Sequence, residues 1–152
     1  IEFELILKKK PATNVFEWKV DAPDLRWFYQ PALTQAEIDD GCSRPENIVG
    51  SYAVYHATRS DAHKDPLATP RSIGILGMKS KAFHVYRPKI TDANGAEIWG
   101  ELSYKNGILS VTVPQNFLDE AVYPVSIDPT FGDATTGASS QSAAVNDIPR
   151  SA

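Results

Sequence analysis

The sequence lacks features that mark several protein classes. It holds one cysteine, Cys42, which excludes an internal disulfide framework. No apolar run approaches the roughly 18 residues that a membrane-spanning helix requires, so we expect no membrane partner. Acidic residues outnumber basic ones by 19 to 15. General binders of phosphate backbones need a basic surface, so we expect no nucleic-acid partner either.

Sequence signatures of catalysis are also missing. There is no G-x-S-x-G motif, phosphate-binding loop, dinucleotide fingerprint or HExxH motif. Cys42 lies in a polar stretch beside no identifiable base, so we interpret it as an incidental thiol. Glu97 and Glu101 share one face of an expected strand, but nothing selects a carboxylate pair for glycoside hydrolysis. We therefore expect neither an enzyme nor a cofactor.

Two histidines, His56 and His84, lie in strand-like segments and would face each other if those strands pair with matching register. A metal site needs three or more converging ligands, so we interpret both as hydrogen-bonded strand residues. They remain weak metal candidates, and a metal-dependent hydrolase is the third hypothesis for function. Residues 92–97 loosely resemble a calcium loop without its twelve-residue spacing, and we expect a plain turn there.

What the sequence does contain is alternation of polar and apolar residues. Hydrophobic residues make up 42% and aromatic residues 10% of the chain, which is typical of a folded domain. Period-2 alternation predicts short strands at residues 1–10, 15–20, 25–29, 47–56, 82–87, 97–104, 108–113 and 123–128. We therefore expect an all-β protein, an antiparallel β-sandwich or a barrel-like module.

Turn and cap residues divide these strands. Residues 1–20 are expected to form a β-hairpin. Thr34 and Glu37 form a capping-box pattern, which predicts a short helical turn at 34–40 ended by Gly41. Asn106 and Gly107 predict a type I′ hairpin turn. A second helical turn is expected at 117–121, and residues 57–80 are expected to form a long loop or a loose hairpin.

The composition divides the chain into two parts. Residues 1–131 are predicted to form the β-rich module. Residues 132–152 are dominated by small and polar residues and are predicted to be a flexible linker or assembly arm. The sequence begins at Ile1 within a strand-like pattern, so we expect the chain to be cut from a longer precursor.

Several segments resemble known protein families. Residues 106–114 (NGILSVTVP) and 121–130 (AVYPVSIDPT) resemble a stretch that closes β-rich modules in Rhs-like and wall-associated bacterial surface proteins. Residues 28–31, 43–56 and 81–88 are similar to uncharacterised virion or tail structural proteins of phages and prophages. The resemblance implies a structural or adhesive role on a virion or outside the cell, and it carries over no catalytic residue.

We therefore expect a non-enzymatic structural or assembly module, with copies of itself or neighbouring domains as partners. Sheet edges, and residues 1–10 and 132–152 in particular, are the expected contact regions. The alternative is a carbohydrate-binding module that stacks glycans on surface tryptophans. Its candidate ligand-binding residues are Trp18, Trp27 and Trp99, at least two of which would have to share an exposed face; their other interpretation is as core aromatics.

Overall fold

The computed structural model describes residues 4–58 and 81–133. Within them, strands form three antiparallel sheets and only two short helices occur. This confirms the all-β, sandwich-like fold. The chain divides into two compact units, the first formed by Ile1–Ala22 with Tyr86–Phe131 and the second by Pro23–Val85 with Gly132–Ala152. None of the helices in the described segments is long and apolar enough to cross a membrane.

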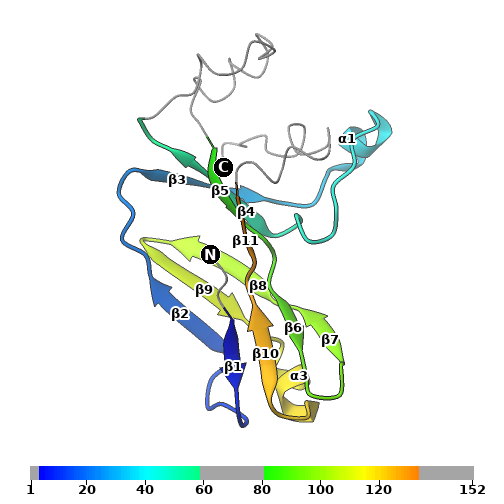
Figure 1. Cartoon of the computed structure of the whole chain (residues 1–152). Coiled ribbons are helices and arrows are strands. Elements are labelled where there is room, and N and C mark those ends of the chain that lie inside the picture. Colours follow the sequence, from blue (N-terminus) through cyan, green and yellow to red (C-terminus); the bar gives the residue numbers. More distant parts are fainter. Residues whose placement is uncertain (1–3, 59–80, 134–152) are drawn as a thin grey trace. The chain divides into compact units, whose positions relative to one another are not determined.

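The first sheet of the first unit has the order β1-β10-β6-β7, with β1 at Leu5–Leu7, β6 at Lys89–Thr91, β7 at Glu97–Trp99 and β10 at Val125–Asp128 (Figure 1). Leu5, Ile127, Ile90 and Ile98 follow one another across the four strands. Because alternate residues of a strand point to opposite faces, these apolar side chains share one face. Ile90 and Ile127 are fully buried there.

The second sheet of this unit has the order β2-β9-β8, with β2 at Val15–Lys19, β8 at Glu101–Lys105 and β9 at Ile108–Thr112. Leu102, Leu109 and Val111 are buried on one face. The opposite face carries the exposed side chains of Glu17 and Lys105. Each sheet therefore buries one face and exposes the other, as a sandwich-like core requires.

Gly100 connects the two sheets, because β7 ends at residue 99 and β8 begins at residue 101. A Cβ atom at Gly100 would lie 2.9 Å from Ile90 Cδ1, 3.1 Å from Pro88 Cγ and 3.3 Å from the Thr112 carbonyl oxygen. A side chain at this corner would therefore require these neighbours to shift. Another link between the sheets contains α3 (Gln115–Glu120), which joins β9 to β10 and buries Leu118.

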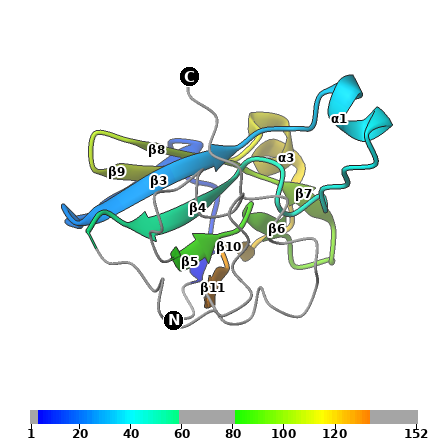
Figure 2. The same cartoon turned by 90° about the horizontal axis from the view of Figure 1, so that it is seen from above.

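The second unit contains a four-stranded sheet of order β11-β5-β4-β3, with β3 at Leu25–Gln30, β4 at Ser51–His56, β5 at Lys81–Val85 and β11 at Phe131–Asp133. In Figure 2, β3, β4 and β5 lie side by side. Ala53 and Val54 of the central strand β4 are fully buried. Residues on both faces of β4 are therefore covered.

Local chemistry explains the ends of α1 (Gln35–Asp39). The Thr34 hydroxyl accepts a bond from the Glu37 N–H, and the Glu37 carboxylate accepts one from the Thr34 N–H, so the predicted capping box is confirmed. After the helix, Gly41 adopts a φ of 86°. Its N–H donates to the Ile38 carbonyl and that of Cys42 to the Glu37 carbonyl, the pair of bonds that defines a Schellman motif.

The Asn106-Gly107 turn also forms as expected. Both residues have positive φ angles, 51° and 75°, which a type I′ turn requires. The turn joins β8 and β9, which pair from Lys105 and Ile108 outward. The local sequence thus fixes the register of this hairpin.

Other expectations need correction. The hairpin over residues 1–20 is wrong, because β1 pairs with β10 and β2 pairs with β9 in another sheet. The strand expected at 97–104 is broken at Gly100. The strand expected at 47–56 begins only at Ser51. The strands β6 and β11 are not predicted by the sequence pattern. The loop at 57–80 and the arm at 132–152 lie outside the described residues except at 57–58 and 132–133.

Candidate functional site

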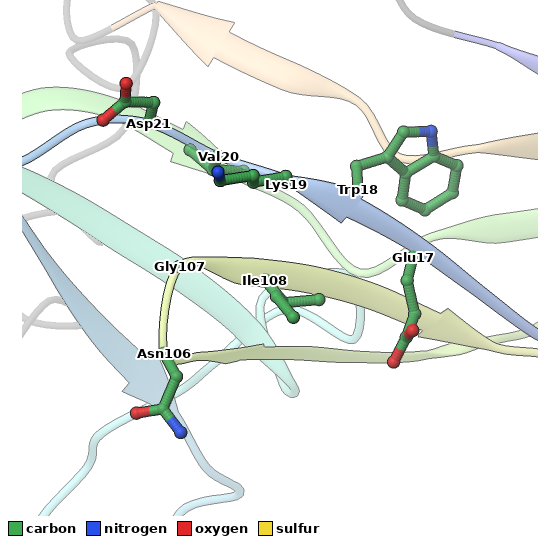
Figure 3. A pocket seen from close by; sticks show the side chains of 8 residues that line it. All are labelled: Glu17, Trp18, Lys19, Val20, Asp21, Asn106, Gly107 and Ile108. Carbon is green, nitrogen blue, oxygen red and sulfur yellow. The ribbon is translucent and has the colours of Figure 1, made fainter.

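A small open hollow lies beside the β8–β9 turn in the first unit. Its volume is about 270 Å³, and Glu17, Val20, Gly107 and Ile108 are among the residues that line it. The Val20 N–H donates to the Gly107 carbonyl over 2.8 Å and holds the end of β2 against the turn. Figure 3 shows the side chains of Glu17 and Ile108 on one side of the strands and the indole of Trp18 on the other.

That arrangement limits what the hollow can bind. A glycan site of the expected type needs an aromatic ring and polar groups that converge on one ligand. Trp18 pairs with Leu109 in the β2–β9 register, so the indole belongs to the face that carries the buried Leu109. The carboxylate of Glu17 belongs to the opposite face. Both residues line the hollow, but their side chains leave β2 on opposite faces, so the ring and the carboxylate do not converge on one ligand.

The other tryptophan of the first unit, Trp99, lies on the solvent-facing side of the first sheet. It pairs with Lys89, and the Arg87 guanidinium carbon lies 5.4 Å and Lys89 Nζ 5.8 Å from the ring centre. Lys89 Nζ also bonds Glu97 at 2.7 Å. The indole thus contacts two cations already. Trp18 and Trp99 occupy different sheets and do not form a common face.

Trp27 lies in the second unit, in an aromatic cluster on one face of the sheet. Its ring makes edge contacts with Tyr52, with centroids 6.0 Å apart, and with Phe83 at 5.8 Å. Tyr29 contacts Tyr52 at 5.4 Å and is 49% exposed. Trp27 and Tyr29 are two residues apart on β3, so they share this face. The outer part of the cluster is therefore open to solvent.

The most polar group of the interior is centred on Ser51 and His84 in the second unit. Ser51 Oγ lies 2.6 Å from His84 Nε2 and 2.5 Å from the Ile48 carbonyl oxygen. Ser51 is fully buried, and His84 is 2% exposed. The carbonyl can only accept, so the single hydroxyl proton is donated to it, and Ser51 accepts a bond from His84 Nε2–H.

Gln30 extends this group. It pairs with Ser51 in the β3–β4 register and is fully buried. Its Nε2 donates to the Phe28 carbonyl over 3.2 Å, whereas its Oε1 is buried without a hydrogen-bond partner. A nucleophilic serine needs a base that accepts its proton, and His84 presents a donor here. The Ser51–His84 bond thus joins β4 to β5, whereas the Gln30 side chain bonds within β3.

The imidazoles of the two histidine candidates do not face each other, although their strands pair. His84 pairs with Ala53, on the face of Ser51, while His56 is three residues beyond Ala53 and pairs with Leu25. Their imidazoles therefore point to opposite faces of the sheet. Within residues 4–58 and 81–133, no three His, Cys, Asp or Glu side chains converge in a way that would hold a metal ion.

The calcium-like segment, residues 92–97, contains a turn that the Asp92 carboxylate holds in place. Its Oδ1 accepts bonds from the N–H groups of Asn94 and Ala96, each at 2.9 Å, and its Oδ2 accepts one from Val122 at 3.0 Å. These bonds hold the pKa of Asp92 below its ordinary value of 3.8, and the bond from Val122 has the largest effect. The carboxylate ties the β6–β7 turn to the segment before β10.

Sequence reasoning found Ser51, His84 and Asp92 individually but missed their contacts. The one local signal for Ser51 was its position after Gly50 at the start of a strand. The contact of Ser51 with His84 follows only from the pairing of β4 with β5. The protein is an all-β, sandwich-like module. No protein-family model, curated protein or solved structure matches the chain, so the likeness to virion and Rhs-like proteins rests on the residue patterns alone.

Proposed function

We propose that this chain is a non-enzymatic structural module of a larger multi-domain protein and that it associates through the edges of its sheets. Its partners are copies of itself or neighbouring domains. The observation that carries the proposal is the position of β1 and β11. They are the first and last described strands, and each is an edge strand, β1 beside β10 and β11 beside β5.

Edge strands favour association because one side of the backbone is not engaged by a neighbouring strand of the sheet. Both β1 and β11 have a neighbouring strand on one side only among the described residues. Large apolar side chains are exposed on two edge strands. Ile6 of β1 is 50% exposed and Tyr29 of β3 is 49% exposed.

The polar groups of the interior support the same proposal. The Ser51 hydroxyl, the His84 imidazole and the Asp92 carboxylate bind other parts of the fold and have no orientation suited to a reacting group. The location on a virion comes from the resemblance of residues 28–31, 43–56 and 81–88 to virion or tail structural proteins. The location outside the cell comes from the resemblance of residues 106–114 and 121–130 to bacterial surface proteins. Both parts of the proposal describe a module whose surface, rather than a pocket, performs its role.

The test is to weaken the docking of β1. Leu5 and Leu7 pair with Ile127 and Val125, so replacing both leucines by serine removes the apolar contacts of β1 with the unit. Ile108→Ser is the matched control, because Ile108 is 42% exposed but lies on β9, the central strand of its sheet. We expect light scattering to show weaker association for the L5S/L7S variant than for I108S, with similar circular dichroism spectra. Equal association of both variants would contradict a role for β1.

A second function, glycan binding, is favoured by the exposed side of the aromatic cluster. Trp27 and the 49% exposed Tyr29 lie on one face of β3, and aromatic rings of this kind stack on sugar faces. Tryptophan fluorescence titrated with a panel of glycans tests it, with Trp27→Phe as the site variant and Trp18→Phe as the control. A response lost only in W27F would support glycan binding, and no response to any glycan would exclude it for that panel.

A further inference from the structure

We propose that β1 is exchanged between two copies of this chain, so that Leu5–Leu7 of one copy docks beside β10 of the other. This inference rests on the proposed assembly function and names its partner and the strand that makes the contact. It is carried by three features of the first unit: the small contact of β1, the composition of the segment that follows it and the fit of its side chains.

The contact of β1 is small. It consists of three register pairs with β10, which join Leu5 to Ile127, Ile6 to Ser126 and Leu7 to Val125. Outside the strand, the Ser126 hydroxyl donates to the Glu4 carboxylate. Leu5 and Leu7 are half-buried and Ile6 is 50% exposed. A contact of this size can be released without unfolding the rest of the unit.

The segment after β1 is suited to act as a hinge. Residues 8–13 join β1 of one sheet to β2 of the other, and fully extended they span about 20 Å. Three consecutive lysines, residues 8–10, are exposed, and their mutual repulsion favours an extended chain. Pro11 restricts Lys10 to extended conformations as well. The segment is therefore compatible with the extended path that exchange requires.

The end of the hinge is held firmly at Asn14. Its side chain donates to the Val113 carbonyl over 3.0 Å, and its carbonyl accepts from the Val113 N–H over 2.8 Å. The Lys10–Asp119 ion pair within the hinge is exposed on both sides, and such pairs contribute little. Exchange thus moves the residues before Asn14 and leaves β2 in place.

The fit of side chains identifies the partner as a second copy. The surface beside β10 receives Leu5 and Leu7 next to the fully buried Val125 and Ile127. An identical β1 from another copy makes the same contacts. Two copies that each donate β1 to the other form a closed, two-fold pair in which every contact of the single chain is restored, which is the low-cost route to a dimer by strand exchange.

A designed disulfide tests the exchange. Ile6 and Ser126 are register partners on the outward face, and such pairs lie within the Cα separation that a disulfide needs. The I6C/S126C variant is made in a Cys42→Ser background and oxidised at a concentration at which the chain is associated. Exchange predicts a disulfide-linked dimer as the main species on non-reducing gels. The control pair T91C/E97C joins β6 to β7 and should yield only bonds within one chain.

If light scattering shows association but the disulfides form only within single chains, strand exchange is overturned and edge assembly is not. If the disulfides form only within single chains and the protein is monomeric, both proposals are overturned. Should neither bond form, a variant that lacks Lys9 and Lys10 is measured by light scattering, because a shortened hinge favours docking of β1 on a second copy over docking on its own β10. Exchange then predicts a stable dimer, and a monomer would overturn it.

Discussion

Ser51 Oγ lies 2.6 Å from His84 Nε2, and this bond joins β4 to β5 inside the second unit. Replacing Ser51 by alanine leaves the buried imidazole without that partner. An unsatisfied buried group costs about 1–3 kcal/mol, so we expect S51A to lower the free energy of unfolding by that amount. Urea denaturation measures it, with the exposed Ser103→Ala as control. Equal stability of S51A and the wild type would contradict the assigned bond.

The same geometry predicts that Ser51 is not a nucleophile. Its proton is donated to the Ile48 carbonyl at 2.5 Å, and His84 presents Nε2–H to it, so nothing withdraws the hydroxyl proton. Incubation with a fluorophosphonate should leave the mass of the chain unchanged. A covalent adduct that disappears in S51A but persists in Ser103→Ala would show an activated serine.

Gly100 predicts a steric effect at the corner between the two sheets of the first unit. An alanine Cβ would lie 2.9 Å from Ile90 Cδ1 and 3.3 Å from the Thr112 carbonyl oxygen. The side chain can shift, whereas the backbone oxygen is held by the sheet. Overpacking of this kind costs about 1–3 kcal/mol. Thermal and urea unfolding of G100A should show that loss, and wild-type stability would mean that the corner yields easily.

Asp92 predicts a dependence of stability on pH. Because bonds from Val122 and other backbone N–H groups lower its folded-state pKa below 3.8, the unfolded chain binds the proton more readily. The stabilisation is therefore complete above 3.8 and is lost as the pH falls through the folded-state value.

The Asp92→Asn variant isolates this contribution. An amide accepts through one oxygen only, so we expect a Tm several degrees lower at neutral pH. The difference in Tm from wild type should shrink as the pH falls from about 5 to about 2. The Asp92 carboxylate becomes protonated over this range, whereas the amide of the variant does not. A difference that is constant over this range would show that the Asp92 charge does not matter.

Local features of the fold could be predicted from sequence because they depend on residues close in the chain. Thr34 and Glu37 cap each other within one helical turn, and Asn106-Gly107 accepts the φ angles of its turn. The order of the sheets could not be predicted in this way. Alternation shows which residues share a face, but it does not name the partner strand, so β1 was assigned to β2 although it pairs with β10.

The candidate site shows the same limit. The strands of His56 and His84 do pair, but Ala53 rather than His56 is opposite His84, and a shift in register decides which face an imidazole occupies. The contact of Ser51 with His84 depends on that register as well. Trp18 and Trp99 were grouped by residue type, and only the sheet order places them on different sheets.

Association through sheet edges is tested most directly by the mass of the full chain in solution. Light scattering coupled to size exclusion is run over a series of rising protein concentrations. We predict a weight-average mass that rises above the 16.7 kDa of one chain and approaches that of a dimer. A mass that stays at one chain over the whole series would contradict self-association through the edges.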